Sequence, residues 1–241
     1  RQRQMCIRDS NRTLAVNANS IDFLKKLGVW NALKINPQPI DKIVIKDDIS
    51  KQPLIFSNQQ ESMGNVIFNK DMYEIARNKL INLGILKNVI NYEIDDVLPD
   101  RIIHIEKEKY LFKKIIISIG KNIIFNKKYK GLKFDQQHYS YVGFIRHAND
   151  HKNTAYEFFT QDGPLAVLPS PADNKKKSTF IYSSKEKINS TQLQKLINKK
   201  IADSHGKLTI NRLISKFPIT PHLIGKNEKY IYVGDSLKSI H

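Results

Sequence analysis

The stretch from residue 139 to residue 184, YSYVGFIRHANDHKNTAYEFFTQDGPLAVLPSPADNKKKSTFIYSS, decides the fold class of this chain. It holds four runs rich in aromatic and β-branched residues: YSYVGFIRH, TAYEFFT, PLAVLPS and STFIYSS. Such residues favour β-strands, and the breaks between the runs fall at Asn-Asp, Asp-Gly and Ala-Asp-Asn, which favour turns. The spacing therefore predicts a meander of antiparallel sheet.

The residues before this stretch predict two helices with strands between them. SIDFLKKLGVWNAL has apolar residues at helical spacing, with Asn19 or Ser20 as the N-cap and a break near Gly28. NKDMYEIARNKLINLG repeats the helical period, and Gly84 stands where a C-terminal cap belongs. Between these helices, IDKIVIKDD and QPLIFS alternate apolar and polar residues, which predicts half-buried antiparallel strands.

Three further runs, NVINYEI, RIIHIEK and YLFKKIIISIG, have strand composition. The last is nearly continuous in apolar residues from Ile115 to Ile119, which is typical of a strand covered on both faces. A helix from about Thr191 to Asp203, then KLTINRLIS and a closing strand, complete the chain. This order predicts a mixed α/β (α+β) protein in which a sheet-rich lobe interrupts a second lobe.

Composition limits the class of protein. The 241 residues are 40% hydrophobic, enough for a sizeable core, and the formal net charge is +17. The lysines are scattered among many Ile and Asn residues, so we favour the codon bias of an AT-rich genome over a dedicated nucleic-acid surface. Cys6 is the single cysteine, which excludes an intramolecular disulfide and a cysteine-based metal site. The first ten residues, RQRQMCIRDS, fit no element and are left outside the fold.

The common catalytic motifs do not occur. The sequence has neither G-x-G-x-x-G nor G-x-S-x-G, and Gly120-Lys121-Asn122 lacks the first glycine and the hydroxyl of a phosphate loop. His147 and His151 are four apart, but the Asn-Asp pair between them predicts a turn, so we predict no metal site. Asp95-Asp96 are expected to be turn residues. Gly120 and Gly234-Asp235 each close a strand and could bring backbone close to one extended ligand.

Residues 147 to 183 resemble the FAD-dependent hydroxylases of ubiquinone biosynthesis, which belong to the aromatic-hydroxylase (p-hydroxybenzoate-hydroxylase-like) flavoprotein monooxygenases. In that family a similar block forms sheet beside the substrate cavity. The matching residues are His151, Ala155, Glu157, Phe159, Gly163, Pro164, Leu165, Ala166, Leu168 and Pro169.

Three other stretches resemble the family in the same order. NRTLAVNANSIDFLKKLGVWNAL is similar to a segment whose arginine approaches the flavin nucleotide, here Arg12, and MGNVIFNKDMYEIARNKL is similar to a helix entry. YIYVGDSLKSIH is similar to a late motif whose aspartate, here Asp235, hydrogen-bonds the ribityl chain. The resemblance implies that FAD is bound by Arg12, Gly120, Gly234 and Asp235, while the catalytic residues stay unassigned.

The resemblance also implies a domain plan. Residues 11–38 and 69–125 would form the FAD-binding lobe, and residues 39–68 and 126–228 the substrate lobe. Residues 229–241 would begin the late flavin-binding segment. On this reading the chain is an internal fragment, with the family's glycine fingerprint expected before Asn11 and a proline- and glycine-rich loop after His241.

The implied function is hydroxylation of the aromatic ring of a polyprenylated phenol, with FAD as cofactor, NAD(P)H as electron donor and O₂ as co-substrate. The family's middle motif, A-D-G-x-x-S-x-x-R, is reduced here to Gly120 within residues 118–126. That departure favours an alternative, a non-catalytic homologue acting as a scaffold in a quinone-biosynthesis complex. A nucleic-acid binder is the third reading. We expect a cytoplasmic protein, either free or peripheral to the inner membrane, with other quinone-biosynthesis proteins as candidate partners.

Overall fold

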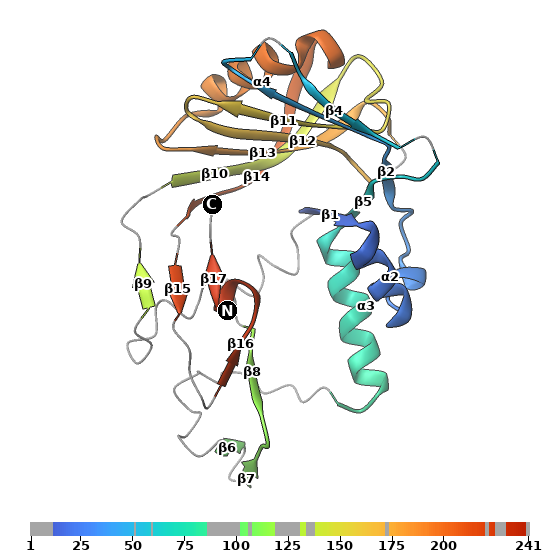
Figure 1. Ribbon diagram of the computed structural model, residues 1–241, viewed down its shortest axis with the longest axis vertical. Helices are drawn as coiled ribbons and strands as arrows, with labels where there is room; N and C mark the ends of the chain where they lie inside the picture. Colours follow the sequence, from blue (N-terminus) through green and yellow to red (C-terminus); the bar gives the residue numbers. More distant parts are fainter. Residues whose placement is uncertain are drawn as a thin grey trace. The chain divides into compact units, whose positions relative to one another are not determined.

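A computed structural model describes residues 12–50, 52–58, 60–85, 102–105, 108–118, 131–133, 138–171, 174–219, 222–224 and 230–239. The chain divides into two compact units (Figure 1). The first unit comprises Arg1–Leu86 and His138–Pro218, and the second comprises Lys87–Gln137 and Ile219–His241. Both contain strands and the first contains the helices, so the mixed α/β class is confirmed.

A seven-stranded sheet dominates the first unit, with the order β14-β10-β13-β12-β11-β3-β4. Its strands are β3 (Lys42–Asp47), β4 (Leu54–Ser57), β10 (His138–His147), β11 (Thr154–Thr160), β12 (Gly163–Pro169), β13 (Lys177–Ser184) and β14 (Leu208–Ile219). The four strands predicted between residues 139 and 184 are all present. Both strands predicted between the helices are also present, as β3 and β4, and they pair antiparallel.

The predicted meander is wrong in one connection. β11, β12 and β13 do follow one another as antiparallel neighbours, but β10 pairs with β13 and not with β11. β3 takes the place beside β11, in parallel register. Residues 148–153 connect β10 to β11 without a hairpin, and β12 and β13 lie between those two strands in the sheet.

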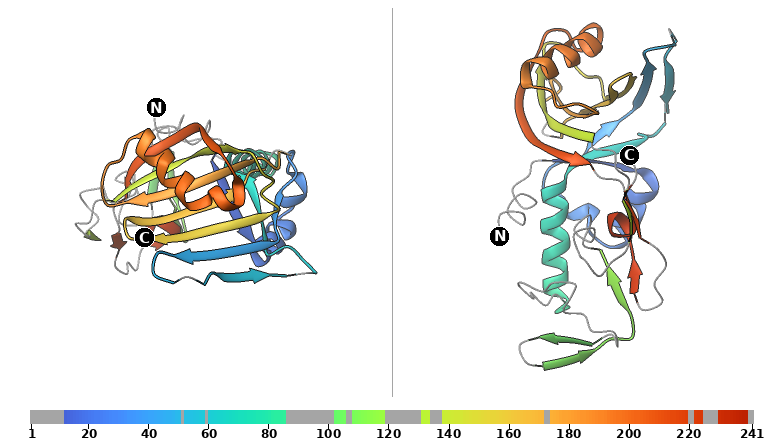
Figure 2. Two further views of the ribbon diagram at one scale, coloured as in Figure 1. Left: turned by 90° about the horizontal axis from the view of Figure 1, so that it is seen from above. Right: turned by 90° about the vertical axis from the view of Figure 1, so that its left-hand side faces the viewer.

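Helix α4 (Ser190–His205) covers one face of this sheet, as Figure 2 shows. It starts with a capping box in which Asn189 and Gln192 bond each other's backbone N–H groups. Its buried residues recur every four positions, at Leu193, Ile197, Ile201 and His205. That stripe packs on Tyr141, Ile145, Phe158, Leu165, Val167, Phe180 and Tyr182 to form the main core.

The opposite face packs on a smaller sheet with the order β1-β5-β2. Its strands are β1 (Thr13–Asn17), β2 (Gln38–Ile40) and β5 (Gly64–Phe68), which pair antiparallel. Ile40 and Val66 contact Ala155 of the large sheet, and Thr13 donates a hydrogen bond to Thr179 at 3.1 Å. Our sequence reading missed β1 and β5, because each is a short run directly joined to a helix.

The two predicted helices flank this smaller sheet as α2 (Ala18–Lys26) and α3 (Asn69–Asn82), with a short 3₁₀ helix η1 (Trp30–Ala32) after Gly28. The breaks at Gly28 and Gly84 are confirmed, with φ of +64° and +67°. The predicted cap of the first helix was wrong. Asn17 caps it by accepting from the N–H of Ser20 at 2.9 Å, because the extended backbone at the end of β1 leaves its side chain free to do so.

The second unit contains short strands. β6 (Ile102–Ile105) and β7 (Glu108–Leu111) form an antiparallel pair. β8 (Ile115–Ile117) pairs in parallel with β16 (Tyr230–Tyr232), and the 3₁₀ helix η4 (Gly234–Ser236) follows. β9 (Gly131–Lys133), β15 (His222–Ile224) and β17 (Lys238–Ser239) form an antiparallel sheet.

Two expectations for this unit need correction. YLFKKIIISIG is not one strand, because residues 112–114 separate β7 from β8. Ile117 is buried but Ile116 is 63% exposed, so β8 is covered on one face rather than two. NVINYEI and Asp95-Asp96 lie outside the described residues.

Candidate functional site

The end of the β8–β16 pair is the first candidate site. The register joins Tyr230 to Ile115 and Tyr232 to Ile117, and the N–H of Val233 donates to the carbonyl of Ile117 at 3.1 Å. Because the strands are parallel, both carboxyl ends meet at one edge. The two strands therefore lie side by side, as the expectation of one ligand near both strand ends requires. The carboxyl edge of parallel strands is where such sheets place nucleotide ligands.

Gly234 turns the chain at that edge. Its φ is +57°, and a Cβ added there would meet no atom within 4 Å. The position thus requires glycine for its backbone and leaves open space beside it. Asp235 is exposed in the next position, and Ser236, which follows it, is buried. An exposed carboxylate beside an open glycine turn fits the hydroxyl-rich chain of a flavin, whose O–H groups an aspartate can accept.

The other two predicted cofactor residues are Arg12 and Gly120. Arg12 belongs to the first unit, directly before β1, and its carbonyl accepts from the N–H of Asn69 at the start of α3 at 2.8 Å. Its side chain is exposed. Gly120 lies outside the described residues, three positions after the end of β8. The structure therefore joins Gly234 and Asp235 to the end of β8 and places Arg12 in the other unit.

The second candidate site is a row of side chains across the large sheet, on the face opposite α4. Register pairs Leu54 with Ile45, Ile45 with Glu157, Glu157 with Ala166, Ala166 with Ile181 and Ile181 with Val142. Paired residues share a face, so five apolar side chains and one carboxyl lie in one line. We call this line the Glu157 row.

Glu157 sits in the middle of that row without a partner. It makes no hydrogen bond or ion pair with any residue that the structure describes, and it is half-buried. Desolvation raises the pKa of its carboxyl from the ordinary value. A carboxyl that holds its proton more tightly than usual, on an apolar surface, can donate to or accept from one polar group of an otherwise apolar ligand.

Exposed apolar side chains extend this surface. Leu54, at the end of the row, is 63% exposed, and Phe56 (47%) and Phe159 (53%) lie beside the row on the same face as Glu157. The neighbouring row, which includes Ala155 and Leu168, is instead covered by Ile40 and Val66 of the smaller sheet. The Glu157 row therefore lies where the covered part of the face gives way to the exposed part.

Our sequence analysis named Glu157 only within a family block and gave it no role. Two signals in TAYEFFT could have found it. Alternation puts Ala155, Glu157 and Phe159 on one face, and an acidic residue on an otherwise apolar strand face is unusual. The neighbours from β3 and β12 could not have been read from the sequence.

Three buried histidines form a cluster on the other face of the sheet, at the end of α4. The ring centroids of His147 and His205 are 4.5 Å apart, and those of His147 and His151 are 6.3 Å apart. The rings belong to the end of β10, to the segment that follows it, and to the last residue of α4. The predicted turn between His147 and His151 is confirmed. No set of three or more metal-ligating side chains converges in the described part of the chain.

Hydrogen bonds fix the tautomers of these rings. His147 Nδ1 lies 2.7 Å from the carbonyl of Asn149 and must donate to it, so Nε2 accepts from the Ser178 hydroxyl at 2.9 Å. His151 Nδ1 accepts from the N–H of Asn153 at 3.1 Å, so its proton is on Nε2. Ser204 donates to the carbonyl of Ile201, so His205 Nδ1 donates to Ser204 at 2.8 Å.

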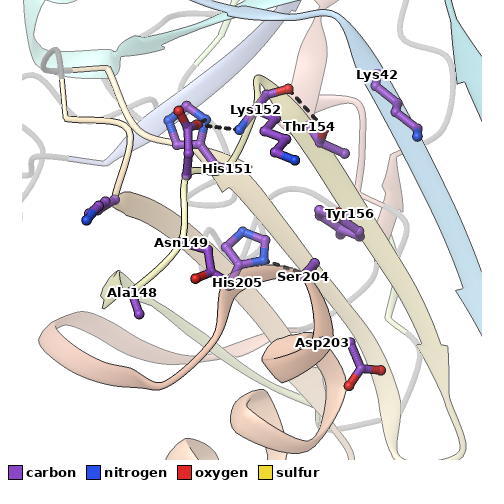
Figure 3. Close-up of a pocket in the computed structure, with 12 residues that line it drawn as sticks. Lys42, Ala148, Asn149, His151, Lys152, Thr154, Tyr156, Asp203, Ser204 and His205 are labelled. Carbon is purple, nitrogen blue, oxygen red and sulfur yellow. Dashed lines mark hydrogen bonds and ion pairs between the residues drawn. The ribbon is translucent and has the colours of Figure 1, made fainter.

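The cluster is neutral because burial penalises charge. Desolvation lowers the pKa of His151 to about 4 and that of His205 to about 3, and it lowers the pKa of His147 as well. A polar cavity of about 760 Å³ adjoins the cluster, and Figure 3 shows Lys152 and Tyr156 beside it. His151 and His205 are among the residues that line this cavity, although the side chain of His151 is 0% exposed. The hydrogen bonds of the three histidines join the end of β10, the segment after it and the end of α4, which is a structural role.

No protein-family model matches the sequence. The chain is 24% identical over 256 aligned residues to the ubiquinone hydroxylase UbiM of Neisseria meningitidis, covering 95% of this chain and 54% of that protein. It is 27% identical over 173 aligned residues to the mitochondrial ubiquinone biosynthesis monooxygenase COQ6 of Caenorhabditis elegans, covering 66% of this chain and 38% of that protein. The chain thus spans about half the length of these relatives or less.

Solved structures share the fold. The p-nitrophenol 4-monooxygenase PnpA of Pseudomonas putida superposes with a TM-score of 0.65 over 97% of this chain and 65% of its own, at 10% identity. The 2-methyl-3-hydroxypyridine-5-carboxylic acid oxygenase superposes with a TM-score of 0.65 over 96% of this chain and 67% of its own, also at 10% identity.

Proposed function

We propose that this chain is part of an FAD-dependent hydroxylase of a polyprenylated phenol. The proposal is supported by its similarity to hydroxylases of ubiquinone biosynthesis and by a fold shared with aromatic monooxygenases. NAD(P)H is the proposed electron donor and O₂ the proposed co-substrate. One observation in the chain itself carries the proposal: the parallel pairing of β8 with β16 presents the Gly234 turn and Asp235 at one strand edge.

The residues at that edge fit FAD. Gly234 leaves space for a ligand to approach the backbone, and Asp235 offers acceptor oxygens to ribityl hydroxyls. Arg12 is the proposed partner of the nucleotide phosphates, and Gly120 a second backbone contact. When bound, FAD would supply the redox chemistry with O₂, which agrees with the absence of a nucleophile motif.

The Glu157 row is the proposed surface for the phenol. Its apolar side chains would pack on the ring and exclude water, while the exposed Leu54, Phe56 and Phe159 offer contacts to a hydrocarbon tail. The Glu157 carboxyl would form a hydrogen bond with the phenolic hydroxyl and so set which ring carbon is presented. The assignment of residues 39–68 and 126–228 to a substrate lobe remains part of this proposal.

The test is flavin content and affinity of the full-length gene product. We expect a yellow protein that oxidises NAD(P)H when the phenol is added. Asp235→Ala should weaken FAD binding by about tenfold or more, because one hydrogen bond to a charged group is lost. Asp162→Ala, which removes an exposed aspartate in a turn of the first unit, should leave the affinity unchanged.

A second candidate function is a scaffold in a quinone-biosynthesis assembly. The observation that favours it is the middle motif, where residues 118–126 keep only the glycine of the family pattern. A folded, colourless full-length protein that binds other quinone-biosynthesis proteins would support the scaffold and end the hydroxylase proposal.

A further inference from the structure

A strained turn stands at the entry to β11. Lys152 and Asn153 have φ of +50° and +52°, and they are the non-glycine residues with positive φ in the described part of the chain. Asparagine tolerates this left-handed region, but lysine rarely adopts it. Two such residues in succession persist only where surrounding contacts hold them.

Short hydrogen bonds hold the turn. The N–H of Lys152 donates to the carboxylate of Asp150 at 2.6 Å, and the N–H of Asn153 donates to His151 Nδ1 at 3.1 Å. Asp150 is partly exposed, whereas the side chain of His151 is fully enclosed. The buried imidazole is therefore the fixed member of this pair of acceptors.

Asn153 is also hydrogen-bonded to a residue of β2 and to the residue just after that strand. Its side-chain oxygen accepts from Gln38 at 2.8 Å, its amide nitrogen donates to Asp41 at 2.8 Å, and its carbonyl accepts from the N–H of Asp41 at 2.9 Å. Gln38 belongs to β2 in the smaller sheet, and Asp41 is the single residue between β2 and β3. Asn153 thus binds the point at which the chain crosses from one sheet to the other.

We propose that His151 is a positioning residue: by holding the left-handed turn at Lys152 and Asn153, it fixes the β2–β3 crossover and so the alignment of the two sheets in the first unit. Arg12 directly precedes β1 of the smaller sheet, and the large sheet carries the Glu157 row. The consequence for catalysis rests on the proposed function, whereas the role in holding the crossover does not.

The proposal depends on the hydrogen bond that His151 Nδ1 accepts. Two variants distinguish the loss of this acceptor from the loss of side-chain packing. His151→Asn keeps an acceptor oxygen at the position of Nδ1, and His151→Gln moves the amide one carbon further along the side chain. Both remove the ring, and because Gln is one methylene larger than Asn, lost packing alone would make His151→Asn the more damaging variant. A third variant, His151→Gln with Lys152→Gly, removes the strain that the histidine has to hold, because glycine adopts positive φ freely.

Amide hydrogen exchange of this chain measures the crossover directly through the N–H of Asp41 and of Asn153. We expect exchange at both to be about fivefold faster or more in His151→Gln than in His151→Asn, as the loss of one ordinary hydrogen bond implies. Adding Lys152→Gly should restore most of the protection. Equal losses in the two single variants, or no loss in either, would overturn the proposal.

The full-length gene product tests the catalytic consequence. In His151→Gln we expect a severalfold higher KM for the phenol and a larger share of NAD(P)H oxidised without hydroxylation, with FAD affinity retained and His151→Asn closer to the parent. Faster exchange at Asp41 with unchanged KM and coupling would overturn the catalytic consequence of this positioning. If the gene product binds no flavin, the proposed function fails, and the exchange experiment still decides whether His151 holds the crossover.

Discussion

Gly234 combines a left-handed backbone with open space, and the two properties lead to separable effects of a substitution. Gly234→Ala should destabilise the chain by about 1 kcal/mol or more, because an L residue is strained at a φ of +57°. It should also reduce FAD affinity, because the methyl group would occupy space that the ligand needs. Chemical denaturation and flavin titration measure the two effects.

Gly84→Ala is the matched control for that substitution. Gly84 has a φ of +67° and open space around it, but it follows α3 in the first unit. A similar cost in stability is expected, with flavin affinity retained. Equal losses of affinity in the two variants would show that Gly234 acts only through stability.

The raised pKa of the Glu157 carboxyl has a definite sign for stability. A native state that holds a proton more tightly than the unfolded state is favoured at low pH, so this contribution is lost as pH rises from the usual range of glutamate through the raised pKa. Glu157→Gln should therefore gain melting temperature relative to the parent as pH rises to 7. Parallel melting curves for the two proteins across that range would contradict the assigned burial.

The histidine cluster has the opposite dependence. Because the pKa of His151 is about 4 and that of His205 about 3, the unfolded chain binds more protons than the native one below about pH 6.5. Stability should be complete above that pH and decline toward pH 4. The charged groups near His151, Asp150 and Lys175, have opposite effects on its pKa, and the neighbouring His147 and His205 are neutral.

His205→Phe tests that dependence. It removes one of the depressed groups, so the decline in the free energy of unfolding between pH 7.5 and 4.5 should shrink by on the order of 2 kcal/mol. Guanidinium unfolding at the two pH values provides the measurement. If the free energy of unfolding of His205→Phe declines as much as that of the parent, groups other than His205 cause the acid sensitivity.

At the scale of the element, α4 depends on one stripe of side chains. Ile197 is 0% exposed in the middle of that stripe, so Ile197→Ala should destabilise the first unit by about 3 kcal/mol through lost burial and a cavity. Lys199→Ala, on the exposed side of the same helix, should change stability by less than about 0.5 kcal/mol. Urea unfolding followed by helical circular dichroism distinguishes the two, and comparable losses would mean that the stripe is not the basis of the packing.

At the scale of the whole molecule, the net charge of +17 makes a prediction about partners. Scattered lysines should bind a duplex DNA of random sequence weakly and through phosphates alone. A contact that neutralises about six phosphates loses roughly 10³-fold in affinity between 50 and 200 mM salt. Fluorescence anisotropy should show that DNA binding disappears over that range of salt. Binding that resists salt and depends on the DNA sequence would instead indicate a dedicated nucleic-acid-binding protein.

None of the helices in the described residues is long and apolar enough to cross a bilayer. The chain is similar in sequence to a ubiquinone hydroxylase and shares its fold with a solved monooxygenase, in agreement with the resemblance seen in residues 147–183. The expected contacts of Arg12, Gly120, Gly234 and Asp235 with FAD remain predictions, and flavin titration of the corresponding variants tests them.

The sequence by itself determined the local structure. Periodicity, caps and turn residues are short-range properties, so the strands between residues 139 and 184, the helix that ends at Gly84 and the mixed α/β class could be predicted from the residues alone. The prediction of strands from sequence missed β1 and β5, because no turn residues of their own mark the ends of these short strands.

Only the tertiary structure decided which strands are neighbours. β3 rather than β10 lies beside β11, and residues distant in sequence meet there, as in the hydrogen bond between Asn153 and Asp41. The same pairing places Glu157 in a row with apolar residues from five other strands, and no local pattern contains that information. Burial raises the pKa of that carboxyl and lowers those of the three histidines, because desolvation depends on everything packed around a group rather than on its place in the sequence.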